Sequence, residues 1–297
     1  MKAPNTPLSF SKPNIVAKGS GLEPFQIDGR FRLGAEIGSG SHGRVFIAKD
    51  IFTGQKVIAK LERSKPRTLE QEYAAYLALA GGNSIPHIHW FRSDSGHHAI
   101  IMEHLGPSLE MYFNACNKRL DLQTVISFAK QLISCIEYIH LHDYIHRDIK
   151  PSNIVLSREI DEVESIKLYI IDFSVARLFR DSNRRHIQFK NDQHFVGNLQ
   201  FASINAHRGV EQSRRDDIES LTYVLVYLIC GDLPWAPLDS EDAYPCDSSS
   251  RILQSKIQTS PKTLCFGLPS GFATMLTYAR GLQFSEKPDY PYLRQLL

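Results

Sequence analysis

The feature that constrains the fold most is a change of pattern near Gly106. Before this point, short runs of β-branched and aromatic residues alternate with glycine-containing turns, which is typical of antiparallel strands. After it, apolar residues recur three and four positions apart, which is typical of helices. A chain of 297 residues is long enough to form two packed lobes. The sequence therefore predicts an α+β, bilobal protein with a small antiparallel β-rich lobe and a larger, mainly helical lobe.

The first lobe is expected to hold several strands and one helix. The helix should run from Leu69 to Leu79 and end at Gly81-Gly82, because glycine commonly terminates helices. Segment 1–24 contains four prolines and shows no periodicity, which predicts a flexible N-terminal tail. The expected strands are 31–37, 44–49, 56–61, 87–91 and 98–103.

The second lobe is expected to be built around two helices. Residues 122–142 carry apolar groups at helical spacing behind Asp121, a residue type favoured as N-cap. Residues 216–230 are apolar nearly all round, which predicts a helix buried at the centre of the lobe. One domain should span 25–297, with a ligand in the cleft between its lobes. The predicted boundaries are 25–103 for the first lobe, 103–106 for the hinge and 107–297 for the second lobe.

Composition and charge argue against several classes of partner. The net charge of +2, from 34 basic and 32 acidic residues, predicts neither bulk nucleic-acid binding nor attraction to anionic membranes. Residues 1–20 lack the apolar core of a signal peptide, and the longest apolar run, 221–230, is about half the length that spans a bilayer. No two of the five cysteines have metal-ligand spacing. We therefore expect a cytoplasmic or nuclear protein without nucleic-acid or membrane partners.

The segment from Gly38 to Val45 fits the pattern G-x-G-x-x-G-x-V. The same glycine spacing opens dinucleotide-binding folds, but there a helix must follow the loop. Here a second predicted strand follows, so the loop connects two strands of a hairpin. Glycine at Gly38, Gly40 and Gly43 would let backbone N–H groups approach phosphate oxygens without interference from a Cβ. A plain glycine-rich hairpin without a ligand is the alternative interpretation.

A lysine stands near the end of the third predicted strand. Side chains alternate along a strand, so Lys60 should share a face with Ile58 and point toward the cleft. A cation there can pair with the α- and β-phosphates of a nucleotide. Glu72, on the following helix, would hold the lysine in place. A surface lysine and an unrelated helix-face glutamate are the alternative interpretation.

The string His146-Arg-Asp-Ile-Lys-Pro-Ser-Asn153 is the most specific in the chain, and Asp172 follows it directly after a predicted apolar strand. Phosphoryl transfer needs a carboxylate that accepts the proton of the attacking hydroxyl, oxygen ligands for Mg²⁺, and a cation near the γ-phosphate. Asp148 suits the first role and Lys150 the last. Asn153 and Asp172 suit the second role. These parts match the general protein kinase template, so the sequence predicts a kinase that uses ATP and Mg²⁺.

Further strings resemble the casein kinase I family, from about Phe25 to the last residue. Ser203-Ile-Asn205 stands where other kinases have Ala-Pro-Glu. The resemblance implies the bilobal protein kinase fold and a monomeric Ser/Thr kinase that uses ATP and Mg²⁺ on protein substrates. The other strings that carry it are Leu105-Gly-Pro-Ser-Leu109, Ile139-His140, Glu211-Gln-Ser-Arg-Arg-Asp-Asp217 and Lys287-Pro-Asp-Tyr290.

The resemblance also assigns roles to individual residues. Met102 would be the gatekeeper, and Glu103 and Leu105 would lie in the hinge that meets adenine. Asp217 would be a buried aspartate that steadies the catalytic loop. A carboxylate favoured by the helix dipole is the alternative for Asp217, and both interpretations can hold. The expected nucleotide contacts are Ile37, Gly38, Gly40, Gly43, Val45, Ala59, Lys60, Met102, Glu103 and Leu105.

The casein kinase I family tends to prefer substrates that are acidic or already phosphorylated upstream of the target residue. Such a preference needs a cationic pocket, and Lys190 stands where the family usually has an arginine for this purpose. Arg184, Arg185, Arg214 and Arg215 would add charge nearby. For Arg184 and Arg185, solvated surface positions are the alternative interpretation.

Several residues depart from the family pattern. His42 replaces an aromatic residue at the tip of the glycine loop, and Gln193 replaces a lysine of the anion pocket. Ser174 replaces a glycine whose backbone freedom serine lacks, and Asn198 replaces a threonine that bridges the catalytic aspartate and lysine. The last two departures favour, as an alternative, a catalytically weak nucleotide-binding pseudokinase or scaffold. The chain stops at Leu297, inside the final helix that the resemblance implies, so we expect that helix to be truncated.

Overall fold

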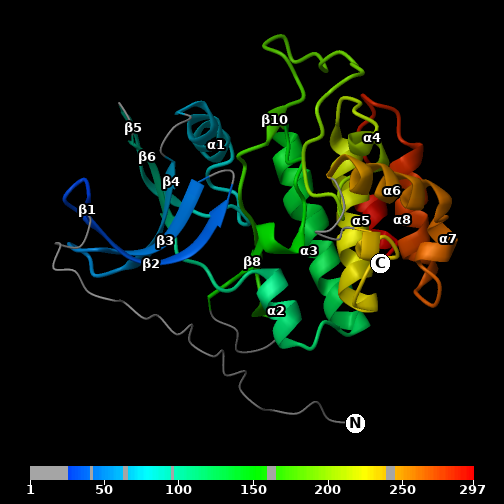
Figure 1. The fold of residues 1–297 in the computed structure, drawn as a ribbon, viewed down its shortest axis with the longest axis horizontal. Helices are drawn as coiled ribbons and strands as arrows, with labels where there is room; N and C mark the ends of the chain where they lie inside the picture. The colour runs from blue at the N-terminus through cyan, green and yellow to red at the C-terminus, as the bar shows by residue number, and fades with distance from the viewer. Residues whose placement is uncertain (1–25, 41–42, 63–65, 95–96, 159–164, 239–244) are drawn as a thin grey trace.

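The computed structural model describes residues 26–40, 43–62, 66–94, 97–158, 165–238 and 245–297. A β-sheet lies at one end of the molecule and helices make up most of the other, as Figure 1 shows. The predicted division into a β-rich lobe and a helical lobe is therefore confirmed. The expected flexible tail, 1–24, and His42 lie outside the described residues.

The β-rich lobe is a six-stranded antiparallel sheet in the order β1-β2-β3-β4-β6-β5. In the hairpin of β2 and β3, Gly40 pairs with Gly43, which excludes a fold in which a helix follows the glycines. Helix α1, Pro66–Ala78, packs beside β5 and β6 and begins at a proline, a residue favoured in the first turn. The strands are β1 Gln26–Ile27, β2 Phe31–Gly40, β3 Gly43–Asp50, β4 Lys56–Glu62, β5 Ile88–Asp94 and β6 His97–Glu103.

The two faces of this sheet have different neighbours. On one face, Ala59 packs with Phe31 and Phe46 in a core that belongs to this lobe. On the other face, Ile58 packs against the main core of the protein. Alternate residues of a strand share a face, so Lys60 lies on the side of Ile58. Lys60, with 6% of its surface exposed, is thereby turned toward α1 and the helical lobe.

The helical lobe is organised around α5, Arg214–Cys230, which is yellow in Figure 1. Nearly all of its residues are buried, which confirms the prediction of a central helix. Helix α3, Leu122–Leu141, packs against it and is capped by Asp121, whose carboxylate accepts from the Thr124 amide at 2.9 Å. Within the described ranges, no helix is long and apolar enough to cross a membrane. The other α-helices are α2 Leu109–Ala115, α4 Ile204–His207, α6 Pro245–Gln258, α7 Pro261–Leu264, α8 Ser270–Gly281 and α9 Tyr290–Gln295.

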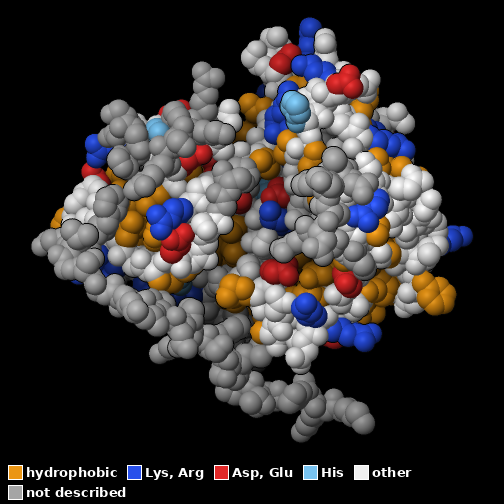
Figure 2. All heavy atoms as spheres, in the orientation of Figure 1, with side chains coloured by type: hydrophobic (Ala, Val, Ile, Leu, Met, Phe, Trp, Pro, Cys, Tyr) orange, Lys and Arg blue, Asp and Glu red, His pale blue; other side chains and the backbone are white. Residues whose placement is uncertain are grey.

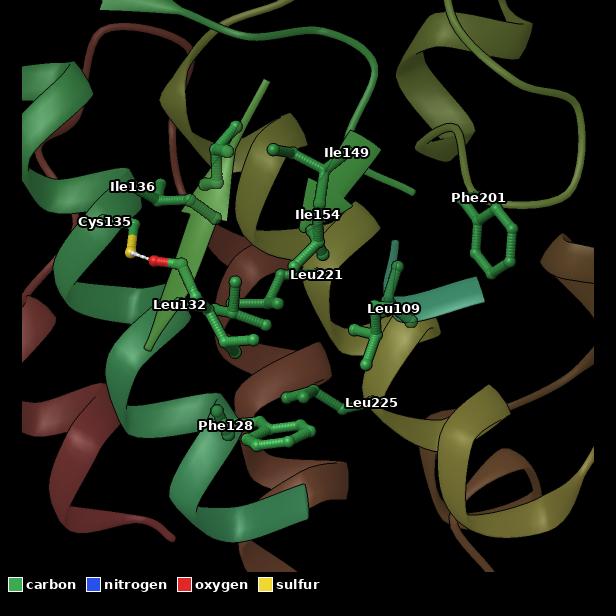
Figure 3. Close-up of a cluster of buried hydrophobic side chains, with 14 of the residues drawn as sticks. Leu109, Phe128, Leu132, Cys135, Ile136, Ile149, Ile154, Phe201, Leu221 and Leu225 are labelled. Carbon is green, nitrogen blue, oxygen red and sulfur yellow. Dashed lines mark hydrogen bonds between the residues drawn. The ribbon is translucent and has the colours of Figure 1, made fainter. Parts of the chain in front are cut away.

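The core of the helical lobe anchors the loop that carries most of the predicted polar residues. Figure 3 shows Ile149 and Ile154 in one cluster with side chains of α3 and α5, including Phe128 and Leu221. Full burial of an isoleucine stabilises a fold by roughly 2 kcal/mol, so both ends of the segment between them are held firmly. Two short pairs of strands flank this loop. They are β7 Tyr144–Ile145 with β10 Arg177–Leu178, and β8 Ile154–Leu156 with β9 Leu168–Ile170.

Candidate active site

Acidic and basic side chains lie together in a hollow between the two lobes (Figure 2). The Lys60 ammonium of β4 lies 2.7 Å from Glu72 of α1 and 2.8 Å from Asp172, which follows β9. One strand, one helix and one loop of the other lobe therefore meet at this cation. The structure places Lys60 against Glu72, as expected, and also against Asp172, which sequence reasoning did not pair with it.

The three charges shift one another's pKa values. Burial on its own would lower the pKa of Lys60, but the two carboxylates outweigh it and the pKa is raised. Burial raises the pKa of Glu72 to about 7 against the opposing effect of Lys60. Burial also works against ionisation of Asp172, yet the Lys60 ammonium holds the pKa of that carboxyl well below its usual range. At neutral pH, Lys60 is therefore a cation and Asp172 an anion.

Because the pKa of Glu72 is raised in the folded state, the free energy of unfolding is expected to fall as the pH rises. A carboxyl whose pKa is raised from 4.5 to about 7 in the folded state stabilises the fold fully below pH 4.5, and this contribution is lost as the pH rises through about 7. Relative to Glu72→Gln, the wild type should lose about 3 kcal/mol of unfolding free energy between pH 4.5 and pH 8, since one pKa unit corresponds to about 1.4 kcal/mol. Urea unfolding of both proteins across this range measures the difference. A difference that stays constant with pH would contradict the prediction.

The 146–153 loop, between β7 and β8, brings three of the predicted polar side chains together. Asp148 Oδ2 lies 2.7 Å from the Lys150 ammonium. Asn153 donates from Nδ2 to the same Oδ2 at 2.9 Å and to the Asp148 carbonyl oxygen at 3.0 Å. The Asn153 amide nitrogen is thus occupied, which leaves its amide oxygen as the atom that can bind a ligand.

The second carboxylate oxygen of Asp148 is the unusual atom of this loop. Asp148 Oδ1 is buried and has no hydrogen-bond partner among the described residues. A buried polar atom without a partner costs free energy, so such atoms in a folded protein indicate where a ligand or water binds. An ionised carboxylate accepts hydrogen bonds only, so the expected ligand group is a donor such as a hydroxyl.

Asp217, near the start of α5, holds the backbone of the 146–153 loop. Its carboxylate accepts from the amides of His146 at 2.8 Å and Arg147 at 2.9 Å, and His140 Nε2 lies 2.9 Å from it. Arg147 has a φ of 68°, in the left-handed region that costs energy for a residue other than glycine. The hydrogen bonds that these two amides donate to Asp217 offset that cost. His140 Nδ1 in turn lies 2.6 Å from the Tyr290 hydroxyl, which ties α9 to the loop.

The segment that begins at Asp172 is fixed by aromatic packing. The Phe173 ring lies edge-on to Tyr76 and to His146, with centroids 5.0 Å and 5.1 Å away. The Tyr76 hydroxyl also accepts from the Asp172 amide at 3.1 Å. A positive φ of 64° falls on Asp172, and Ser174 is not among the described residues with positive φ. Serine in place of glycine is therefore accommodated here without backbone strain.

The glycine-rich hairpin lies beside Lys60 in the sheet. Val45 pairs with Lys60 across β3 and β4, so both side chains face the hollow between the lobes. Gly43 has a φ of 113°, and a Cβ there would lie 2.4 Å from the Leu61 carbonyl oxygen, so glycine is required at this position. Gly38 belongs to the same hairpin and is exposed. The hairpin therefore has the position expected of a loop that covers phosphates.

The assignment of Ala59 as a nucleotide contact is wrong. Neighbouring residues of a strand point to opposite faces, so Ala59, next to Lys60, is buried in the core on the far face. Ile58 is on the face of Lys60 instead and pairs with Met102 of β6. Glu103 ends β6, and its amide donates to the His87 carbonyl oxygen at 2.8 Å. Ile58 therefore replaces Ala59 in the candidate set.

Lys190 is exposed in the segment between β10 and α4. Its carbonyl oxygen accepts from the Glu211 amide at 2.9 Å, and Glu211 forms an ion pair with Arg177 at 2.8 Å. Arg177 thus brings a second cation to this segment, which sequence reasoning did not single out. The structure therefore connects Lys190 to Arg177 through Glu211, and the anion pocket itself stays a prediction.

Two of the arginines that were expected to add charge near that pocket make contacts inside the helical lobe. The Arg214 guanidinium lies 4.5 Å over the Phe179 ring and donates to the Ser285 carbonyl oxygen at 2.6 Å. Arg215 donates to the Leu282 carbonyl oxygen at 2.8 Å. Both side chains therefore hold segments of the lobe together. The remaining pair, Arg184 and Arg185, is exposed, as solvated surface residues would be.

Asn198 closes a turn in its own loop. Its side-chain oxygen accepts from the Gln200 amide at 2.9 Å. The preceding Gly197 has a φ of 116°, and a Cβ there would lie 2.7 Å from the Arg147 carbonyl oxygen, so the two loops approach closely. The aspartate and lysine that a threonine would bridge contact each other directly.

The residues present fit a magnesium ion bound together with a nucleotide. The Ile171 amide donates to the Asn153 carbonyl oxygen at 2.9 Å, which holds Asn153 next to Asp172. Their amide and carboxylate oxygens are ligands that Mg²⁺ prefers. In the part of the chain that the structure describes, no three His, Cys, Asp or Glu side chains gather as a metal site. Mg²⁺ commonly takes only one or two protein oxygens and completes its shell with water and substrate phosphates, so this pair suffices.

Around Lys60 and Asp172, sequence reasoning missed Tyr76 and Ile58. Tyr76 sits on α1 within an ordinary helical pattern, and no motif marks its contact with the Asp172 amide. Ile58 could have been predicted from the sequence, because strand alternation already places it on the face of Lys60.

The family model for the protein kinase domain matches residues 31–265 of this chain. The matched range begins with β2 and ends just after α7. It contains the glycine-rich hairpin, the Lys60 cluster and the 146–153 loop described above.

Proposed function

The chain belongs to the protein kinase family, and on this premise we propose that it is an active Ser/Thr kinase of the casein kinase I type. Protein kinases use ATP and Mg²⁺ and act on protein substrates. This enzyme transfers the γ-phosphoryl group of ATP to a Ser or Thr hydroxyl. The observation that carries the proposal is the buried, unpaired Asp148 Oδ1 beside the Lys150 ammonium.

In the transfer step, Asp148 Oδ1 accepts the proton of the substrate hydroxyl as the hydroxyl oxygen bonds to the γ-phosphorus. The bond between the γ-phosphorus and the β–γ bridging oxygen breaks, and its electron pair leaves with ADP. Lys150 lies within contact distance of Asp148 and neutralises charge on the transferred group. Because Oδ2 is held by Lys150 and Asn153, the Asp148 carboxylate keeps one orientation.

The nucleotide binds between the sheet and the 146–153 loop. Lys60, held by Glu72, pairs with the α- and β-phosphates. Asn153 and Asp172 would hold Mg²⁺, which would supply positive charge that neutralises the phosphates. The proposed remaining contacts are Ile37, Gly38, Gly40, Gly43, Val45, Ile58, Met102, Glu103 and Leu105.

Assignment to the casein kinase I type is supported by the contacts of Ser203-Ile-Asn205. Ser203 donates to the buried Asp216 carboxylate at 2.7 Å, and Asn205 donates to the same oxygen at 3.0 Å. These bonds attach the segment to α5 where other kinases use Ala-Pro-Glu. None of the side chains of Ala-Pro-Glu has a hydrogen-bond donor when the glutamate is ionised, so this attachment needs the Ser and Asn of the family string.

A nucleotide-binding scaffold that transfers phosphate weakly is the competing proposal. It is favoured by Asn198, whose side-chain oxygen closes its own turn. Incubation of the purified chain with γ-labelled ATP, Mg²⁺ and dephosphorylated casein separates the two. The kinase proposal expects label on Ser or Thr residues of casein. Binding of Mg-ATP without transfer of label would support the scaffold instead.

Lys190→Glu is expected to weaken the preference for phosphorylated substrates. Lys190 is exposed on the segment that Arg177 and Glu211 hold, and reversing its charge replaces attraction for an upstream phosphate by repulsion. The KM for a peptide with an upstream phosphoserine should rise about 10-fold, the scale of one charge-assisted contact. A matched peptide without upstream charge should change less than about 2-fold. An equal loss on both peptides would place the pocket elsewhere.

A further inference from the structure

A lysine inside the helical lobe holds the loop that follows Gly197. Lys256 lies on α6, far along the chain from that loop, and 0% of its surface is exposed. Its ammonium nitrogen donates to the carbonyl oxygens of Leu199 at 2.8 Å and Ala202 at 2.6 Å. Burial of an ammonium group costs free energy unless it is hydrogen-bonded, so the surroundings of this lysine are built to receive the charge.

Aromatic side chains also lie around the ammonium group of Lys256. It lies 5.1 Å from the centre of the Tyr223 ring and 5.2 Å from that of Trp235, within the range of cation–π attraction. Trp235 also donates from Nε1 to the Gln200 carbonyl oxygen at 2.8 Å. His207 Nε2 lies 3.1 Å from the ammonium nitrogen and 3.1 Å from the Leu199 carbonyl oxygen. Lys256 and Trp235 therefore fix three backbone carbonyl groups of the loop, those of Leu199, Gln200 and Ala202.

The same loop reaches the active site. Gly197 lies so close to the 146–153 loop that a Cβ would come within 2.7 Å of the Arg147 carbonyl oxygen. Gln200 lines a surface pocket of about 310 Å³. A shift of residues 197–202 would therefore change both the approach to Asp148 and the wall of this pocket. The residues that line the pocket are Lys118, Gln200, Tyr227, Gly231, Asp232 and Ala236.

We propose that Lys256 is a positioning residue for the protein substrate. This inference rests on the proposed kinase function. The Lys256 ammonium group fixes the 197–202 loop, and the substrate polypeptide lies against this loop while its hydroxyl approaches Asp148. Lys256 contacts the loop backbone and not the reacting atoms, so it is not a catalytic residue. The nucleotide contacts come from the sheet, the hinge and the 146–153 loop. Lys256 should therefore affect binding of the protein substrate and leave binding of ATP unchanged.

Lys256→Met keeps the length of the side chain and removes its charge and hydrogen bonds. The KM for dephosphorylated casein should rise about 10-fold or more, because a displaced loop no longer aligns the substrate. The KM for ATP and the basal hydrolysis of ATP, which needs no protein substrate, should change less than about 2-fold. Lys256→Arg keeps the donors and should recover most of the affinity for casein. The control for the loss of one positive charge is Lys262→Met, at an exposed lysine of α7.

A second measurement does not depend on kinase activity. The amides of Phe201 and Ala202 donate to the Asn198 carbonyl oxygen, so their hydrogen exchange reports the order of the loop. Exchange at these amides should become about 10-fold faster or more in Lys256→Met, while exchange in α5 stays the same. If this variant fails to fold, Trp235→Phe removes the donor to the Gln200 carbonyl oxygen and should give a smaller change in the same direction.

The two measurements distinguish the inference from the proposed function. If the wild type transfers no phosphate, the kinase proposal is overturned. If the loop amides nevertheless exchange faster in Lys256→Met, the role of Lys256 in holding the loop stands. Unchanged exchange together with an unchanged KM for casein would overturn the inference. An equal rise in the KM values for ATP and casein would also overturn it, because the effect would then be a general loss of structure.

Discussion

Asp148→Asn is expected to lower kcat about 10³-fold while the fold and the KM for ATP stay unchanged. Asparagine has nearly the same shape as aspartate, but an amide does not take up the proton of the attacking hydroxyl at neutral pH. General base catalysis contributes about 10²–10⁴-fold, and the expected loss lies within that range. The effect on ATP should be small, because Lys60, Asn153 and Asp172 hold the phosphates and Mg²⁺ in the proposed complex.

Steady-state kinetics with casein and ATP varied in turn separate a change in kcat from a change in KM, and calorimetric titration checks the binding of Mg-ATP. Asp143→Asn is the matched control, because it makes the same chemical change at a carboxylate that pairs with Arg180 at 3.0 Å. This control should keep kcat within about 2-fold of wild type, since partly exposed ion pairs contribute little. Wild-type turnover by Asp148→Asn would refute the assignment of Asp148 as the base and remove the main support for the kinase proposal.

Most of the fold could be predicted because local patterns encode its elements. Apolar residues at helical spacing predict α3, and an apolar surface on all sides predicts that α5 is central. Helix α5 begins at Arg214, two residues before the predicted start at Asp216. The Asp216 side chain accepts from the Ser213 amide at 2.7 Å, as the residue three positions after the N-cap does in a capping box, and this bond stabilises the first turn. The capping signal was present in the sequence, but the hydrophobic pattern alone does not show it.

The contacts of the site were less predictable, because they join residues that are far apart in the chain. The Lys60 and Asp172 side chains meet across 112 positions, and those of His140 and Tyr290 meet across 150 positions. No local pattern records such a pair, so the sequence indicates which residues act together only through motifs. Tyr76 has no motif, and its hydrogen bond with the Asp172 amide therefore emerges only from the fold.

The error at Ala59 and the unforeseen contacts of Arg214 and Arg215 have different causes. Alternation along β4 already places Ala59 on the face opposite to Lys60, so the sequence itself contains the information that excludes Ala59 from that face. The contacts of Arg214 and Arg215 could not be predicted from a local pattern in the sequence. A guanidinium group is usually exposed, and only the packed lobe supplies the Phe179 ring and the carbonyl oxygens that occupy these two.

Lys60→Met is expected to lower kcat about 10²-fold or more, because one preorganised charge beside the phosphates is lost. The same change leaves Glu72, with 1% of its surface exposed, without the cation that it pairs with. Breaking a buried ion pair from one side destabilises a protein by about 3–5 kcal/mol where the remaining group stays charged, so this cost should be largest at alkaline pH, because the pKa of Glu72 is already about 7 with Lys60 present and rises further without it. A fall in activity of this single variant therefore has two physical explanations, lost chemistry and lost stability.

The double variant Lys60→Met/Glu72→Gln separates these explanations. Glutamine does not ionise, so the buried carboxyl that the single variant leaves without a cation is removed, and unfolding in urea at alkaline pH, where that carboxyl is most ionised, should show recovery of most of the lost stability. The kcat should stay about 10²-fold below wild type, because the phosphates still lack their cation. Lys56→Met, at the exposed start of the same strand, controls for the loss of a lysine. If kcat recovers together with stability, Lys60 acts by holding α1 against the sheet and not by contact with the phosphates. If the single variant already has the wild-type kcat, Lys60 lies outside the reaction.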